Sequence, residues 1–254
     1  SGEPQEIDRW LMSRLQAHIA RTTDALNRFQ TRQALQESYF GIESDLKWYR
    51  RRLGRDAAGS RELHELCSVW VRLLAPFIPF TAENLWKDLG EEGLVSFADW
   101  PVATEQRKDE KAELAEELLA RTVEDIESIL KLIQMQPKAI TIALAPAWKQ
   151  SIFTTIATAG DKNTVVKEIM KDETMRKRGK AATDAAKQIT TLIHRLPPHV
   201  VAPLAKEPIN EKAVFEAAKG FLEQEFGVAI HIADAEGSDL AKAATALPFK
   251  PAIV

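Results

Sequence analysis

The sequence predicts a multi-domain, mainly helical protein in which an antiparallel helix bundle is followed by a small α/β domain. The length of 254 residues favours two domains, at roughly 100–200 residues each. Apolar residues recur at helical spacing through residues 1–107, whereas short segments of alternating apolar residues interrupt the helical pattern of residues 108–254. A strongly polar stretch over residues 102–117 lies between these patterns. We therefore place the domain boundary between residues 107 and 108.

Helical periodicity predicts a series of helices in the first part, joined by short loops that favour antiparallel packing. Pro76 and Pro79 end the third helix, because a helix interior has no place for their missing N–H groups. Thr81 is expected to cap the fourth helix. The helices are expected over about residues 7–26, 35–53, 63–74 and 81–90.

The second part combines helices with two predicted strands. Alternating apolar residues predict strands over 138–144 and 228–232, and the proline-containing tail 248–254 is extended enough to add an edge strand. Asn210 and Gly227 are expected to bound the last helix. The helices are expected over about residues 110–134, 147–158, 162–172, 180–195 and 210–226.

Composition excludes several classes of protein. The 37 acidic and 34 basic residues give a net charge of −3, which argues against a wholly basic nucleic-acid binder but not against local basic patches. No apolar run approaches the ~20 residues of a membrane span, so we expect a soluble, cytoplasmic protein without a membrane partner. The single cysteine, Cys67, cannot form an internal disulfide or a multi-cysteine zinc site.

The sequence offers no credible catalytic or metal centre. Gly54 and Gly59 have the spacing of a phosphate loop, but Ser60 and Arg61 stand where that loop needs Lys and Ser or Thr. The five histidines lack metal-ligand spacing. A stand-alone enzyme that uses Cys67 as nucleophile remains an alternative, although a small buried apolar residue is the favoured interpretation.

Two basic clusters stand out against the acidic total and predict phosphate binding. The first lies at the end of the second predicted helix and contains Lys47, Arg50, Arg51, Arg52 and Arg55. The second is the segment 162–195, which carries nine basic and four acidic residues. Its sequence RKRGK at residues 176–180 is expected to lie between two helices, where the glycine lets the backbone approach a ligand closely. It includes Lys171, Arg176, Lys177, Arg178, Lys180 and Lys187.

Sequence motifs of the first part resemble a known family. The chain contains, in order, DRWLMSRL at residues 8–15, DLKWYR at 45–50 and LAPFIPFTAENLW at 74–86. These motifs resemble the anticodon-binding helix bundle of class Ia aminoacyl-tRNA synthetases. Phe80 and Asn84 depart from that family's usual His and Glu. The segments VEDIESILK at 123–131, PKAITI at 137–142 and PFKPAIV at 248–254 are similar to the appended C-terminal domain of leucyl-tRNA synthetases of the archaeal/eukaryotic type.

The resemblance implies a tRNA-binding C-terminal fragment of a leucine–tRNA ligase, or a gene product that lacks the catalytic part. The family's catalytic and editing domains have no counterpart here, so no catalytic residue, metal or cofactor is expected in this chain. ATP and Mg²⁺ would be used by the absent catalytic domain. The expected partners are tRNA(Leu) and the catalytic and editing domains of the parent chain, with other synthetases or translation factors as further candidates and no DNA.

The resemblance also implies which residues meet tRNA. Lys47, Arg50, Arg51 and Arg52 would contact the tRNA backbone, and the cations of residues 171–187 would steer the long variable arm. Phe249, Lys250, Ile253 and Val254 would lie near the tip of that arm, where unpaired bases offer edges and stacking faces. A rival interpretation is a protein-interaction scaffold that docks a partner through the acidic helix over 109–127, without direct tRNA binding.

Overall fold

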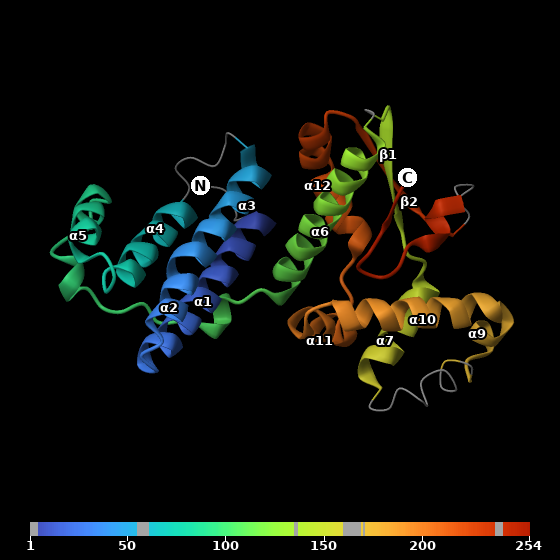
Figure 1. Ribbon diagram of the computed structural model, residues 1–254, viewed down its shortest axis with the longest axis horizontal. Coiled ribbons are helices and arrows are strands. Elements are labelled where there is room, and N and C mark those ends of the chain that lie inside the picture. The colour runs from blue at the N-terminus through green and yellow to red at the C-terminus, as the bar shows by residue number, and fades with distance from the viewer. Residues whose placement is uncertain (1–4, 55–60, 135–136, 160–168, 170, 237–240) are drawn as a thin grey trace. The chain divides into compact units, whose positions relative to one another are not determined.

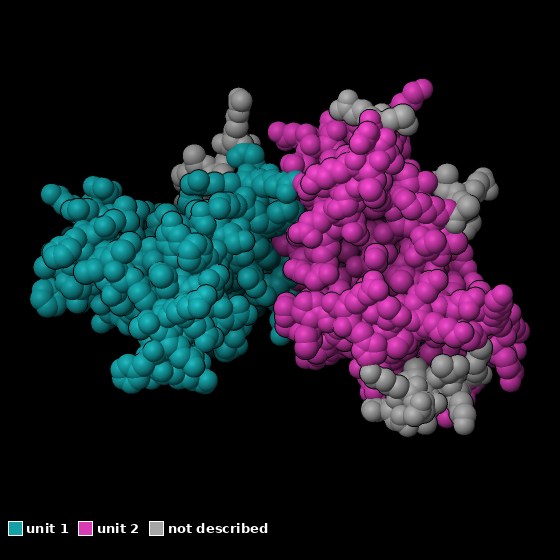
Figure 2. All heavy atoms as spheres, in the orientation of Figure 1, with its two compact units in different colours: residues 1–113 teal, residues 114–254 magenta. Residues whose placement is uncertain are grey.

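The structure is a computed structural model that describes residues 5–54, 61–134, 137–159, 169, 171–236 and 241–254. The chain divides into two compact units, Ser1–Glu113 and Leu114–Val254 (Figure 2). The domain boundary predicted at residue 107 lies shortly before this division and stays a prediction. In the part of the chain that is described, no helix is both long and apolar enough to cross a membrane.

Unit 1 is a helix bundle, as predicted (Figure 1). Helix α1 packs against α2, α3 and α4, and α4 packs against α5. A π-helical segment, η1, joins α2 to α3, so the predicted helix over 35–53 is continuous but changes its hydrogen-bond pattern. The elements are α1 (Glu6–Asn27), α2 (Thr31–Leu35), η1 (Gln36–Gly41), α3 (Ile42–Leu53), α4 (Arg61–Leu74), α5 (Pro79–Asp88), and the 3₁₀ turns η3 (Val95–Phe97) and η4 (Glu105–Arg107).

The core of unit 1 follows from the apolar spacing of its helices. Leu11 and Leu15, four residues apart on α1, are buried against Leu46 of α3 and Leu66 of α4. Each such side chain contributes roughly 1.5–3 kcal/mol when it is fully buried. Tyr49 is also fully buried, and its hydroxyl donates a hydrogen bond to Asp8 Oδ1 at 2.7 Å. The residues that predicted the helices therefore also form the core.

A buried histidine connects α1 to the π-helical segment and α3. His18 Nδ1 lies 3.2 Å from Glu37 Oε2, and His18 Nε2 lies 2.9 Å from Asp45 Oδ2. Burial lowers the pKa of His18, but the hydrogen bonds to Asp45 and Glu37 outweigh it, and the pKa is raised above its ordinary value. An imidazolium ring donates from both nitrogens, so it suits a position between two carboxylates. Arg14 Nε also donates to Asp45 Oδ2, at 2.8 Å.

The predicted start of the fourth helix was wrong. Helix α5 begins at Pro79, and Thr81 lies inside it rather than at its cap. Proline fits the first helical position because its φ is already helical and the missing N–H would have no partner there. Pro79, which is expected to end the third helix, therefore begins the next one.

Unit 2 consists of a small three-stranded sheet and the helices that pack around it. Strand β1 is central, parallel to β2 and antiparallel to β3, which confirms the predicted edge strand in the tail. The parallel register pairs Ala139 with Ala229 and Leu144 with Asp234. The elements are α6 (Glu110–Ile133), whose start lies in unit 1, β1 (Ala139–Leu144), α7 (Ala147–Thr158), α9 (Glu173–Arg178), α10 (Lys180–Arg195), α11 (Pro198–Lys206), α12 (Glu211–Phe226), β2 (Ala229–Asp234), the 3₁₀ turn η5 (Ala241–Thr245) and β3 (Ala252–Ile253).

Two features of unit 2 differ from the sequence prediction. Residues 176–178 form the last turn of α9 instead of a loop, and only Gly179, with φ of +53°, separates α9 from α10. Helix α11 was not predicted, because Pro197 and Pro198 indicate a break between helices. Pro197 is instead the N-cap of α11, Pro198 is its first residue, and Pro203 lies inside it. The helix predicted over 162–172 falls mostly outside the described residues.

Two polar side chains, Lys149 and Glu211, form hydrogen bonds to the segment that leads to β3. Lys149 Nζ donates to the carbonyl oxygens of Ala244 and Ala246, each at 2.7 Å, and burial lowers the pKa of this lysine. Glu211 Oε1 accepts a hydrogen bond from the Phe249 N–H at 2.7 Å. Part of the Glu211 residue is exposed, but its Oε2 is enclosed and has no hydrogen-bond partner among the described residues. Burial raises the pKa of Glu211 to about 7.

The His18 contacts predict that Gly41→Ala destabilises unit 1. A Cβ atom at position 41 would lie 2.5 Å from His18 Cε1, so the ring would have to leave its carboxylate partners. We expect a loss of about 1–3 kcal/mol in the free energy of unfolding. Urea unfolding followed by tryptophan fluorescence measures it. In the control Gly220→Ala, the new Cβ meets no atom within 4 Å. Equal stability of wild type and Gly41→Ala would contradict the argument.

The Glu211 contacts predict a pH-dependent stability of unit 2. The carboxyl pKa is about 7 in the folded chain, against an ordinary 4.5, so the stability falls as pH rises from about 4.5 to about 7 and levels off above that. Glu211→Gln keeps an oxygen acceptor for Phe249 but cannot ionise, so we expect it to be more stable than wild type at pH 8, by up to about 3 kcal/mol.

Urea unfolding at pH 5 and pH 8, followed by circular dichroism, measures this difference. The control is Glu216→Gln, which removes an exposed carboxylate from the same helix. An identical pH dependence in wild type and Glu211→Gln would show that Glu211 is not responsible.

Candidate nucleic-acid interface

The first predicted basic cluster lies at the C-terminal end of α3. Lys47 and Arg50 are exposed, whereas Arg51 and Arg52 are half-buried. Lys47 Nζ lies 2.8 Å from Glu43 Oε1, and the Arg51 guanidinium lies 5.8 Å from the centre of the Trp48 ring. Cations at this end of a helix interact favourably with its dipole. The structure therefore brings these four residues together on one helix end; Arg55 lies outside the described residues.

The second basic cluster is exposed along α9 and α10. Arg176 and Lys177 lie in the last turn of α9, and Lys171 precedes that helix; all three are exposed. Lys177 Nζ pairs with Glu173 Oε1 at 3.1 Å, one helical turn away. Exposed ion pairs of this kind contribute little stability, so Lys177 can exchange its partner for a phosphate at low cost.

Helix α10 presents a row of exposed polar side chains. The members of this row are spaced three or four residues apart, so they lie on one face of the helix. That face is opposite the one that buries Ala185, Ile189 and Leu192. Lys180 and Lys187 lie about 10 Å apart along the helix axis, at 1.5 Å per residue. The exposed row contains Lys180, Asp184, Lys187, Thr191 and Arg195.

Arg178, unlike a cation without protein partners, makes contacts with two other side chains. Its Nη2 donates to Glu236 Oε1 at 2.8 Å, and its guanidinium lies 4.8 Å from the centre of the Trp148 ring. These contacts fasten the end of α9 to α7 and to the segment after β2. Sequence reasoning missed Trp148 and Glu236, because only the tertiary fold brings them to Arg178. The Arg178 side chain is still 38% exposed.

The four C-terminal residues expected near the variable arm divide into a buried and an exposed pair, and their contact with tRNA stays a prediction. Phe249 and Ile253 are buried, with 2% and 7% of their surfaces exposed, so neither offers a stacking face in this structure. Phe249 lies in a tight turn closed by hydrogen bonds between Leu247 and Lys250, and Ile253 belongs to the sheet. Lys250 is exposed, and Val254 is 37% exposed. Of these four side chains, Lys250 and Val254 are the more accessible in this structure.

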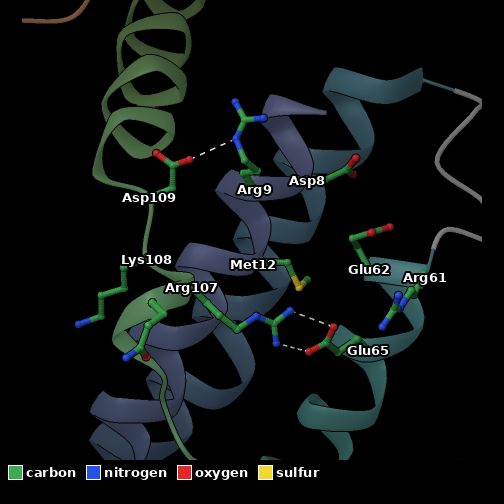
Figure 3. A pocket seen from close by; sticks show the side chains of 10 residues that line it. Asp8, Arg9, Met12, Arg61, Glu62, Glu65, Arg107, Lys108 and Asp109 are labelled. Atoms are coloured by element: carbon green, nitrogen blue, oxygen red, sulfur yellow. Dashed lines mark hydrogen bonds and ion pairs between the residues drawn. The ribbon is translucent and has the colours of Figure 1, made fainter. Parts of the chain in front are cut away.

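A pocket of about 330 Å³ lies in unit 1 between α1, the start of α4 and the segment before α6 (Figure 3). Two pairs of its charged side chains are hydrogen-bonded: Arg107 donates two hydrogen bonds to the Glu65 carboxylate, and Arg9 Nε donates to Asp109 Oδ2 at 3.2 Å. The hydrogen bonds from Arg107 lower the pKa of Glu65 despite partial burial. Among the described residues that line it, no nucleophilic side chain lies beside a base.

Cys67 has the surroundings of a structural residue. It is half-buried and packs against the core of unit 1. Burial raises the pKa of its thiol, although the charge of Arg50 opposes the shift. Because the thiolate is the reactive form, this environment disfavours a nucleophilic role. Among the residues that the structure describes, no group of three or more His, Cys, Asp or Glu side chains is placed to hold a metal ion.

Comparison with known proteins connects this arrangement to tRNA ligases. Residues 8–144, from α1 to the end of β1, match the family described as the anticodon-binding domain of tRNA ligase. This match covers more than half of the chain. The chain therefore belongs to the family of tRNA ligases that carry this anticodon-binding domain.

Leucine–tRNA ligases match essentially the whole of this chain, which confirms the more specific resemblance. The Pyrococcus abyssi enzyme is 37% identical over 254 residues, covering 99% of this chain, and that of Pyrococcus horikoshii is 39% identical over the same length. The Methanothrix thermoacetophila enzyme is 35% identical over 261 residues, covering 100% of this chain. The chain spans 25–26% of the length of these curated relatives.

Proposed function

We propose that this chain is the tRNA-binding C-terminal part of a leucine–tRNA ligase and that it positions tRNA(Leu) through backbone contacts and the long variable arm. The observation that carries the proposal is the exposed row of cations on α9 and α10 in a chain whose net charge is −3. A local basic surface on an acidic protein has the electrostatic character of a phosphate-binding site. The membership in a family of tRNA ligases supports tRNA as the nucleic acid.

Within this proposal the two basic clusters have different tasks. Lys47, Arg50, Arg51 and Arg52 hold the tRNA backbone beside the bundle, and the cations of α9 and α10 steer the variable arm. Lys250 and Val254 remain candidates for a contact at the tip of that arm. Phosphate contacts of this type fix position and orientation but do not read base sequence.

The reaction itself is assigned to other parts of the parent protein. The proposal places the catalytic and editing sites, with ATP and Mg²⁺, in domains outside this chain, and those domains are its partners together with tRNA. The chain alone is then expected to bind tRNA without charging it. The cytoplasm is the compartment that fits this role.

The proposal predicts a preference for tRNA with a long variable arm. Filter binding of tRNA(Leu) and of a short-arm tRNA, each at two salt concentrations, measures it. We expect tighter binding of the long-arm tRNA and a steep loss of affinity with salt, because phosphate contacts release counterions. Equal binding of both tRNAs would contradict the role of the variable arm.

The proposal also predicts the effect of removing two cations from α10. Lys177 and Arg178 have carboxylate partners, whereas Lys180 and Lys187 make no ion pair with any residue that the structure describes. The double variant Lys180→Ala and Lys187→Ala should flatten the slope of log K against log salt by about 1.4–1.8, at roughly 0.7–0.9 per phosphate contact.

The matched control is Lys131→Ala with Lys206→Ala, which removes two exposed lysines from α6 and α11. Its slope should equal that of wild type. If the control and the α10 variant change the slope equally, the interface does not lie on α10.

A further inference from the structure

Helix α1 ends in a motif that normally requires glycine. The Phe29 N–H donates to the Leu26 carbonyl oxygen at 2.9 Å, and the Gln30 N–H donates to the Ala25 carbonyl oxygen at 2.8 Å. This pair of hydrogen bonds is a Schellman motif, in which the first residue after the cap adopts a left-handed conformation. Phe29 stands at that position with φ of +58°. A residue with a Cβ atom is strained there, and glycine is not.

The side chain of Phe29 is not stabilised by burial in the protein. The residue is 91% exposed. Phe249 provides the comparison, because it has nearly the same φ, +61°, but is only 2% exposed and donates its N–H to Glu211. Burial and hydrogen bonding compensate the strain at Phe249. The N–H of Phe29 is also hydrogen-bonded, to the Leu26 carbonyl, but its ring is not buried, so an exposed aromatic ring is held at a strained position.

The surroundings of Phe29 are polar and basic. An open hollow of about 680 Å³ follows the turn and is lined by Phe29, three glutamines, Thr31 and Arg32. Arg28 precedes Phe29 and is exposed, with its Nη2 3.0 Å from Asp24 Oδ1. Glutamine amides both donate and accept hydrogen bonds, and guanidinium groups bind phosphate. An apolar partner surface would leave these groups without partners, whereas RNA would satisfy them.

We propose that the ring of Phe29 is a stacking platform for an unpaired nucleobase of bound RNA. Gln30, Gln33 and Gln36 line the space in which the edge of that base would lie, and Arg28 and Arg32 are placed for the neighbouring phosphates. Unpaired bases stack on exposed aromatic side chains in RNA-binding proteins. This inference rests on the proposed function, because it presupposes that the chain binds tRNA.

The variant Phe29→Gly separates binding from folding. It removes the ring but supplies the residue that the turn prefers, so the thermal midpoint of unfolding should stay equal or rise. The affinity for tRNA(Leu) in filter binding should fall by about 5- to 150-fold, as expected when one stacked base is lost. Phe29→Trp keeps a stacking face and should retain affinity within a factor of about 3. The control Phe97→Ala removes another exposed ring, 85% accessible, and should leave the affinity unchanged.

The outcomes distinguish this inference from the proposed function. If wild type does not bind tRNA, the proposed function fails. If wild type and Phe29→Gly bind equally, or if Phe97→Ala weakens binding as much as Phe29→Gly, the stacking site is wrong while tRNA binding stands. A photoreactive phenylalanine derivative at position 29 should crosslink to tRNA. A crosslink to a second protein chain alone would assign this turn to a protein contact instead and overturn the inference.

Discussion

The bundle of unit 1 depends on one buried ionic arrangement, the imidazole of His18 between Glu37 and Asp45. The desolvation of the two carboxylates is offset because the ring donates to both of them, Arg14 adds a hydrogen bond to Asp45 and Arg21 adds one to Glu37. Together with the burial of Leu46 and Tyr49, this arrangement holds one face of α3 against α1, so the opposite face is left to solvent. Lys47 and Arg50 lie outside this inward face and are exposed.

The distribution of charge in unit 2 shows how a nearly neutral chain can present a basic surface. Carboxylates accompany some of the cations, as Glu173 does Lys177 and Glu236 does Arg178, but α10 leaves Lys180 and Lys187 unpaired with respect to the described residues. Arg178 and Trp148 add rigidity at the junction of α9 with α7. A surface of this kind combines fixed cations that define an orientation with loosely paired cations that can adapt to a backbone.

Much of the fold could be predicted from the sequence, because the apolar period of α1, α3, α6 and α10 reports directly which face is buried. The strands were predicted from alternation, and Asn210 and Gly227 bound α12 as expected from their capping roles. Proline was ambiguous: Pro79 begins α5, and Pro198 begins α11, although the same residue ends helices elsewhere. The burial of Phe249 and the partners of Arg178 could not be predicted, since both depend on residues distant in sequence. The basic clusters were found because charge needs no tertiary information.

The pairing of β1 with β2 has a consequence for how the chain reaches this fold. The two strands are parallel neighbours, yet Ala139 pairs with Ala229 across a connection that contains α7 to α12. Closing such a long loop carries an entropic cost that the strands recover only after the helices between them are ordered. During synthesis on the ribosome, all residues of unit 1 are made before strand β2, so unit 1 can fold while the sheet of unit 2 is still incomplete. Strand β1, the central strand, is made before both of its partner strands. Until they are made, only the neighbouring helices can shield its apolar side chains from water.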